Sequence, residues 1–357
     1  MTNLLTLLVA VLVFGLLVLV HELGHFLAAR RCGIRVEEFS IGFGPALLSR
    51  EKNGTRFTLR LVPLGGYNLL TAPPQEEGEE ARPAPARSRA FTMQGKDFGE
   101  ATAWQRFFVI AAGALMNFAA GFLILLILVC GQEVLTSRVI YDFTGAAASR
   151  ASGLREEDEI LAVNGSPCFI MEDVLYELQR TQNHTADFTV LREGRMVQVK
   201  GVTFDTVAAE NGAQTMRVDF RVYGIQKSAR TVTRQTFAYF CYYARSILRS
   251  FVDLAVGRVG INELSGPVGV VSAVNQAVRY GWRDVLALAA LLTVNLGIFN
   301  LLPIPALDGF KLLFLAVEGV SGYVVPQRIQ NALNTAGMAL LLWLMLFVTM
   351  QDITKFL

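Results

Sequence analysis

The stretch that decides the fold is LLTLLVAVLVFGLLVLVHELGHFLAARR, residues 4–31. It carries no charge from Leu4 to Val20, and its apolar character continues almost to Arg30. A helix needs about 20 apolar residues to cross a bilayer, so the stretch predicts a membrane span. Three ionisable side chains nevertheless fall within it, in the segment HELGH at 21–25. Such groups are costly inside a membrane and usually serve a function.

The spacing of these side chains fits a metal site. Positions i and i+4 share one face of a helix, so His21 and His25 can bind one zinc ion while Glu22 acts as a base. A solvated helix end is the less favoured interpretation, because Arg30 comes nine residues after His21. At 1.5 Å per residue, that separation puts His21 about 13 Å below the charged flank.

Three more long uncharged runs follow, at 107–130, 285–307 and 332–350. Only 17% of the 357 residues are charged, against about 25% in a typical soluble domain. We therefore expect four transmembrane helices rather than four buried helices of a soluble domain, in which uncharged runs this long are rare. The net charge of +2 gives no support to nucleic-acid binding. The four cysteines have neither metal-site nor disulfide spacing.

The basic residues predict the orientation of the first span. Lys and Arg are absent before it, whereas Arg30, Arg31 and Arg35 follow it, so the positive-inside rule places the N-terminus outside the cytoplasm. Alternation then puts 30–106 inside the cytoplasm, and 131–282 and the C-terminus outside it. The HELGH segment is therefore expected toward the cytoplasmic side of the membrane.

The remaining stretches complete the expected organisation. A hairpin turn at 52–55 predicts a β-loop, and a Pro-, Glu- and Arg-rich stretch predicts a flexible linker. Apolar residues at helical spacing in 234–256 predict an amphipathic helix, either on the outer membrane surface or within a soluble domain. The expected segments are a first span at 1–32, a membrane-associated β-loop at 33–72, a cytoplasmic linker at 73–101, a second span at 102–131, an α+β domain with a helix near 171–182 at 132–206, a segment with the amphipathic helix at 207–282, a third span at 283–320, and a fourth span with the C-terminus at 321–357.

A catalytic zinc site normally has three protein ligands, and Asp308 is the best candidate for the third. The third histidine, His184, falls in the outer domain on the wrong side of the membrane, and Cys32 lies beyond the two arginines. Asp308 is the last residue but one of a helix-breaking stretch, NLLPIPALDG at 300–309, at the depth expected for the two histidines. Within that stretch, one interpretation is that the Asn300 side chain hydrogen-bonds to the substrate or to a backbone group that the helix break leaves unpaired. The other is that it only forms a hydrogen bond between two helices.

Hydrolysis of a peptide bond inside a membrane needs access for water and an extended substrate. Zinc would polarise the carbonyl, and Glu22 would carry a proton from water to the leaving amine. The β-like segment that ends in PLGGY at 63–67 either supplies an edge strand for an unwound substrate or is a structural hairpin.

These motifs together resemble those of the bacterial site-2 proteases, most closely the RseP-like regulators of intramembrane proteolysis. The family's HExxH is matched at 21–25, its NxxPxPxLDG pattern at 300–309, and its GGY element at 65–67. A stretch SGPVG at 265–269 is also similar to the family, and the likeness covers nearly the whole chain. One departure is Phe310, which follows LDG where the family usually has a second glycine.

The resemblance implies a set of site residues. His21, His25 and Asp308 would bind one zinc ion per chain, and Glu22 would be the general base. The residues that handle substrate or shape the site would be Asn300, Pro303, Pro305, Gly65, Gly66 and Tyr67.

Residues 148–165 resemble part of a PDZ domain of the bacterial type, which implies one PDZ domain at 132–206. The usual Gly-Asp before the strand reads Glu157-Asp158 here, so its turn would differ. PDZ grooves add a peptide strand to a sheet edge, which would make a peptide a partner of this domain. In the family the domain is thought to filter substrates by size.

The residues and the resemblance together predict an α-helical integral membrane protein of the bacterial cytoplasmic membrane. Its function would be that of an intramembrane zinc metalloendopeptidase. Its substrates would be single-span membrane regulators of the anti-sigma-factor type, trimmed beforehand by another protease, or remnant signal peptides. The alternative is a non-catalytic membrane scaffold that binds partners through the PDZ domain, which the presence of Glu22 and Asp308 disfavours. A metal transporter would spread acidic or histidine residues over several spans, and no internal repeat supports one.

Overall fold

The computed structural model describes residues 4–70, 95–181, 184–208, 214–258, 260 and 266–356. Most of the expected linker, 73–94, and Ser265 of the SGPVG stretch lie outside these residues. The chain divides into two compact units, one made of Met1–Ile124 with Ser246–Leu357 and the other of Leu125–Arg245.

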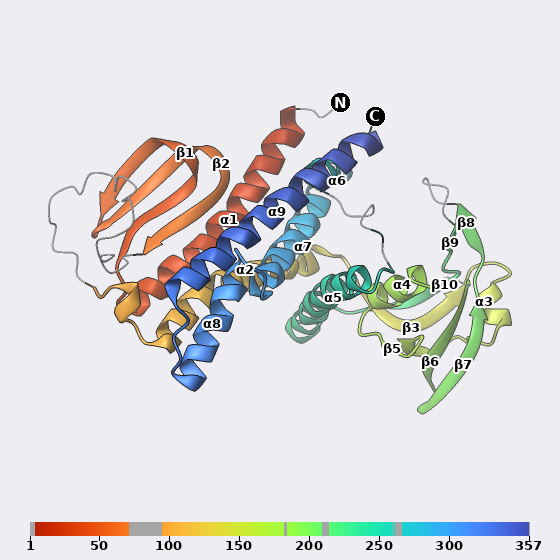
Figure 1. Cartoon of the computed structure of the whole chain (residues 1–357). Helices are drawn as coiled ribbons and strands as arrows, with labels where there is room; N and C mark the ends of the chain where they lie inside the picture. The colour runs from red at the N-terminus through yellow and green to blue at the C-terminus, as the bar shows by residue number, and fades with distance from the viewer. Residues whose placement is uncertain are drawn as a thin grey trace. The chain divides into compact units, whose positions relative to one another are not determined.

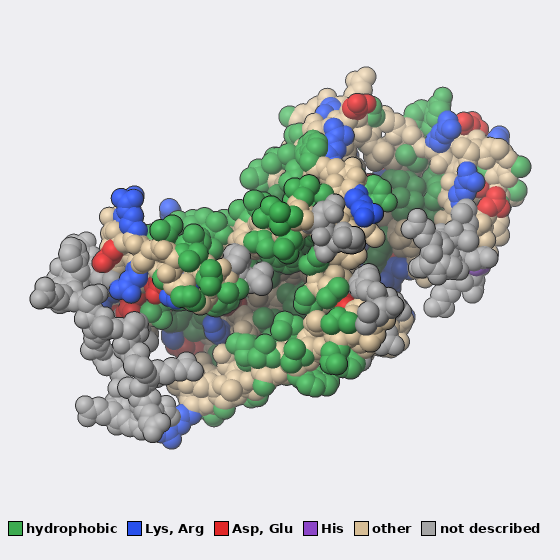
Figure 2. Space-filling model, turned by 90° about the horizontal axis from the view of Figure 1, so that it is seen from above, with side chains coloured by type: hydrophobic (Ala, Val, Ile, Leu, Met, Phe, Trp, Pro, Cys, Tyr) green, Lys and Arg blue, Asp and Glu red, His purple; other side chains and the backbone are tan. Residues whose placement is uncertain are grey.

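Four long apolar helices lie wholly or mostly in the first unit (Figure 1). Each is long and apolar enough to cross a membrane, so the four helices are candidate spans that agree with the prediction and support a multi-pass membrane protein. Large apolar side chains on their outer faces are exposed, among them Leu12 and Trp343, and Figure 2 shows broad areas of such side chains. A bilayer covers surface of this kind. The helices are α1 (Leu4–Arg31), α2 (Ala103–Gly131), α7 (Trp282–Leu301) and α9 (Gln327–Phe356).

The buried side of α1 determines where the HELGH segment lies. Its buried residues recur every three or four positions, which is the spacing of one helix face, and they include Val13, Leu17, His21 and Gly24. Val13 and Leu17 pack against Ala289 of α7. The histidines therefore lie on the side of α1 that faces protein.

A β-sheet lies beside α1 in the same unit (Figure 1) and consists of two long strands, β1 (Val36–Lys52) and β2 (Thr55–Leu70). Lys52 pairs with Thr55 across a turn at Asn53 and Gly54, so the predicted hairpin is confirmed. Positive φ at both turn residues matches their type, because Asn and Gly tolerate that conformation best.

Both strands of this sheet bend back on themselves. Thr58 pairs with Ser49 on one side and with Ser40 on the other, and Ser40 also pairs with Tyr67. Across the sheet, the four segments therefore lie side by side in the order 46–52, 55–62, 36–43 and 66–70. Segment 66–70 of β2 is therefore an edge of the sheet. Strand β2 also contacts α1.

The segment expected to hold the third span, 283–320, contains two helices, and the break between them falls within the helix-breaking stretch predicted at 300–309. Helix α7 ends at Leu301, a non-helical stretch covers 302–307, and α8 (Asp308–Ser321) follows. The prolines at 303 and 305 explain the break, because proline lacks the amide hydrogen that a continuous helix needs. A side chain at Gly309 would put its Cβ 2.2 Å from the Leu302 oxygen, so only glycine fits.

Two boundaries differ from the prediction. The end of the expected linker is ordered: Lys96 bonds to Gly33 and Arg35, and the 3-10 helix η1 (Phe98–Glu100) follows. A helix within 207–282 was missed: α6 (Pro267–Tyr280) is short and begins at the proline of SGPVG. Its residue Asn275 accepts a hydrogen bond from Thr6 of α1.

The second unit is an α+β domain with a six-stranded antiparallel sheet in the order β10-β3-β4-β6-β7, with β5 beside β4. Its core includes the fully buried Ile140, Ile160 and Phe188. The sheet reaches β10, so the domain continues past the expected boundary at 206. Its elements are β3 (Leu135–Phe143), α3 (Ala148–Ala151), β4 (Glu159–Val163), β5 (Ser166–Pro167), α4 (Met171–Gln179), β6 (Thr185–Arg192), β7 (Arg195–Thr203), β8 (Thr206–Ala208), β9 (Gln214–Met216) and β10 (Phe220–Ile225), where β8 and β9 form a separate pair.

Helix α5 (Ala229–Ala255) begins in this unit, five residues before the helix expected at 234–256. The Tyr239 hydroxyl donates to Glu172 of α4 at 2.6 Å, and the rings of Tyr242 and Tyr176 meet edge to face. The first half of α5 therefore packs on the α+β domain, which favours the second of the two interpretations of this helix.

Candidate active site

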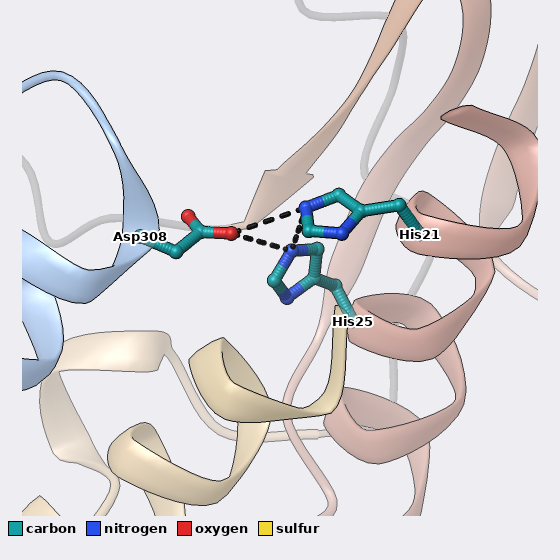
Figure 3. A group of neighbouring side chains, drawn as sticks. All are labelled: His21, His25 and Asp308. Atoms are coloured by element: carbon teal, nitrogen blue, oxygen red, sulfur yellow. Dashed lines mark hydrogen bonds and ion pairs between the residues drawn. The ribbon is translucent and has the colours of Figure 1, made fainter. Parts of the chain in front are cut away.

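The three predicted ligands lie together, although Asp308 is far from the histidines in sequence (Figure 3). His21 and His25 project from adjacent turns of α1, and Asp308 is the first residue of α8. Asp308 Oδ2 lies 3.1 Å from Nε2 of each histidine, and the two Nε2 atoms lie 3.1 Å apart. Each of the three side chains is less than one-fifth exposed.

This triangle of atoms fits a zinc ion. Zn–N and Zn–O bonds of about 2.0–2.1 Å in a tetrahedron place neighbouring ligand atoms about 3.3 Å apart, close to the three separations of 3.1 Å. Two imidazole nitrogens and one carboxylate oxygen form a donor set typical of catalytic zinc, with the fourth position open. Among the described residues, only this group of His, Cys, Asp and Glu has the spacing for a metal.

Helix α2 supports the histidines from the other side. His25 Nδ1 donates to the Val109 carbonyl oxygen at 2.8 Å, which leaves the Nε2 lone pair free for a metal. A side chain at Gly113 would put its Cβ 2.3 Å from His25 Nε2. The glycine therefore lets the backbone of α2 lie directly against the imidazole rings.

The edge segment 66–70 holds the candidate base. Asn68 Nδ2 donates to the Glu22 carboxylate Oε2 at 2.7 Å and to the Glu22 carbonyl oxygen at 2.8 Å. A Cβ at Gly66 would lie 2.8 Å from the Ser40 oxygen and 3.0 Å from Glu22 Cγ, so glycine permits this close approach. Sequence reasoning missed Asn68, because a single asparagine after GGY has no recognisable spacing.

The other two residues of the GGY element belong to the sheet. Gly65 has a φ of 104°, which favours glycine. The Tyr67 hydroxyl donates to Glu38 at 3.1 Å and accepts from Arg60 at 2.6 Å. Burial alone would raise the pKa of the Glu38 carboxyl, but hydrogen bonds from Arg60 and Tyr67 hold that pKa below its usual value. Tyr67 thus stiffens the sheet, and none of its described contacts reaches the candidate ligands.

The residues of the 300–309 stretch have different surroundings. Asn300 is buried, and its Nδ2 lies 3.5 Å from His21 Nε2. Pro305 packs against α9, where a Cβ at Gly337 would meet it at 2.2 Å, whereas Pro303 is exposed. Ala306 has a φ of 78°, and its amide donates to Asn334 of α9.

The two rejected ligand candidates remain outside the group. Cys32 is half-buried and packs on the apolar cluster that includes Ala28 and Ala29. His184 belongs to the second unit, before the start of β6.

Comparison with known proteins decides the family. The model of peptidase family M50 matches residues 9–344. The chain belongs to peptidase family M50. This membership confirms the resemblance to the site-2 proteases and the predicted enzyme class, a site-2 zinc metalloprotease.

This M50 protease aligns with similar members of the family over almost the whole length of both chains. It is 31% identical to the zinc metalloprotease RasP of Shouchella clausii, with 98% of this chain and 99% of the relative aligned. It is 29% identical to the zinc metalloprotease RasP of Geobacillus kaustophilus, with 97% of each chain aligned. It is also 29% identical to the regulator of sigma-W protease RasP of Bacillus subtilis, with 98% of each chain aligned.

Proposed function

We propose that this M50 protease cuts peptide bonds within the spanning segments of single-span membrane proteins, with Glu22 as general base. Its ligands for one zinc ion are His21, His25 and Asp308. The observation that carries the proposal is the triangle of ligand atoms, 3.1 Å on each side, on a spanning helix. Glu22 occupies the same turn of that helix.

The depth and orientation of the site follow from the charge pattern. His21 lies nine residues before Arg30 on an otherwise apolar helix, so the catalytic group lies below the membrane surface. The arginines after α1 support a cytoplasmic-side site in a bacterial cytoplasmic membrane, with both termini and the α+β domain outside the cytoplasm.

The chain's own side chains divide the work of hydrolysis. Zinc, when bound, supplies Lewis-acid chemistry that polarises a peptide carbonyl and acidifies water. Glu22 accepts a proton from the attacking water and delivers it to the leaving amine. Asn68 holds Oε2 of Glu22, so Oε1 is the oxygen for proton transfer. The buried Asn300 amide, close to His21, is suited to donate to the oxygen on which negative charge develops.

An extended substrate has a docking edge in this arrangement. Segment 66–70 pairs with 36–41 on one side, and the described pairings give its other side no strand partner. Gly66 and Asn68 bring this segment beside Glu22. A substrate strand added to this edge would present its backbone to the base in a fixed register. Of the two interpretations of PLGGY, the contact with Glu22 supports the substrate edge.

The α+β domain is proposed to be a PDZ domain that filters or binds peptides. Support comes from the likeness of 148–165 and from the antiparallel sheet with α4 packed on it. The substrates are proposed to be membrane-anchored regulators of the anti-sigma-factor type, already trimmed outside, or remnant signal peptides. The name of the Bacillus subtilis relative, regulator of sigma-W protease RasP, is consistent with the first class.

Co-expression of a single-span reporter with the wild-type protein or with Glu22→Gln tests the proposal. We expect a truncated reporter with wild type only, because glutamine cannot accept the proton. The purified Glu22→Gln protein should still bind zinc, since its ligands are intact. Equal truncation by both proteins contradicts the role of Glu22. Truncation by neither, together with a wild-type protein free of zinc, favours the non-catalytic scaffold.

A further inference from the structure

Asn117 of α2 has a feature that the proposed chemistry leaves unexplained. Its side chain is fully buried, and its Nδ2 lies 3.2 Å from Nδ1 of His21. Its other end, Oδ1, is buried without any hydrogen-bond partner. Buried polar atoms are nearly always hydrogen-bonded, so an orphaned amide oxygen beside a candidate metal ligand needs an explanation.

The two ends of an amide have nearly the same shape, and hydrogen-bond chemistry decides which one faces a partner. With the nitrogen facing His21, the imidazole must accept at Nδ1, and a neutral ring then carries its proton on Nε2. That atom faces Asp308 and His25, and with a proton it has no lone pair for a metal. With the oxygen facing His21, Nδ1–H donates to Oδ1, Nε2 is free to bind a metal, and the amide nitrogen takes the place that the oxygen now holds.

We propose that Asn117 is a positioning residue of the metal site. Its Oδ1 accepts the Nδ1 proton of His21 and so selects the tautomer and ring orientation in which Nε2 binds zinc. Metal-binding histidines almost always donate their second ring nitrogen to an oxygen acceptor. The inference rests on the proposed zinc site.

The companion histidine supports this assignment. His25 donates its Nδ1 proton to the Val109 carbonyl oxygen. Val109, Gly113 and Asn117 follow one another at intervals of four, so they share one face of α2. Helix α2 therefore supplies an oxygen acceptor to each imidazole, and Gly113 between them allows the close contact.

The test measures zinc affinity of the purified full-length protein in detergent, by competition with a chelator. Asn117→Leu keeps the size of the side chain and removes the acceptor, so it should weaken zinc binding by about 10- to 100-fold. Asn117→Asp keeps an acceptor and should bind within about threefold of wild type or tighter. Thr293→Val is the matched control, because its buried hydroxyl donates within its own helix to Ala289.

Each outcome is decisive. Wild-type affinity in Asn117→Leu, or an equal loss in Asn117→Asp, overturns the role of Asn117. If the wild-type protein binds no zinc, the proposed metal site itself is wrong, and this result is distinct from a failure of the role proposed for Asn117. If the leucine variant does not fold, ¹⁵N-histidine labelling of zinc-loaded wild type replaces it, since the chain has three histidines. We expect a proton on Nδ1 of His21 that is hydrogen-bonded to the Asn117 amide, and its absence overturns the proposal.

Discussion

Glu22 owes its position to one neighbouring amide. Asn68 donates two hydrogen bonds to it, one to the carboxylate and one to the backbone carbonyl. The same asparagine belongs to the edge segment proposed to dock substrate, so one residue links the base to the docking edge. A carboxylate fixed by a charged hydrogen bond loses little freedom when it takes part in proton transfer.

Replacement of Asn68 by alanine should therefore slow cleavage without loss of zinc. A hydrogen bond to a charged group contributes about 1.5–3 kcal/mol, so we expect a fall of about tenfold or more in kcat. The measurement pairs the initial rate of reporter cleavage with the zinc content of the purified variant. Leu48→Ala, at an exposed position on the opposite edge of the sheet, is the control. An unchanged rate, or a loss of zinc, would show that Asn68 does not act through Glu22.

At the scale of elements, the placement of Asp308 depends on how closely α8 approaches the end of α7. Gly309 lies against the backbone of Leu301 and Leu302. An ion pair between Arg106 of α2 and Glu318 joins the later turns of α8 to α2. The acidic Asp308 in the first turn also suits the positive end of the helix. Asp308 is thus positioned beside the histidines because contacts with α7 fix the first turn of α8 and the ion pair with α2 fixes its later turns.

Gly309→Ala should move Asp308 and weaken zinc binding. The added Cβ would lie 2.2 Å from the Leu302 oxygen, so α8 has to shift. A shift of about 1 Å is comparable with the tolerance of a metal site, and we expect at least a tenfold loss of zinc affinity. Gly319→Ala in the same helix is the matched control, because its Cβ meets only the Trp104 ring at an ordinary 3.7 Å. Equal zinc affinity in the two variants would contradict this account of α8.

At the scale of the whole molecule, local patterns predicted the spans and the metal ligands. Uncharged runs are continuous in sequence, and the HELGH spacing places both histidines on one helix face. Asp308 was predicted because the helix break and the depth of the third span are also local features.

Residues whose role depends on packing could not be predicted in this way. Asn68 and Asn117 are single polar residues, and their roles arise from contacts between elements distant in sequence. The return of β1 and β2 on themselves and the capping of α6 by Asp352 of α9 are tertiary features too. Helix α6 was missed because a short amphipathic helix inside a long outer segment has no strong signal.

The central claim is that a zinc site on α1 and α8 cuts peptide bonds inside a membrane span. The most direct measurement incubates the purified protein with a purified single-span substrate and determines the masses of the products. We predict a cut within the span, toward its cytoplasmic end, that stops when a chelator removes zinc and resumes when zinc is returned. The Glu22→Gln protein should make no cut. A cut confined to residues outside the span, or one that persists in Glu22→Gln, would contradict the account.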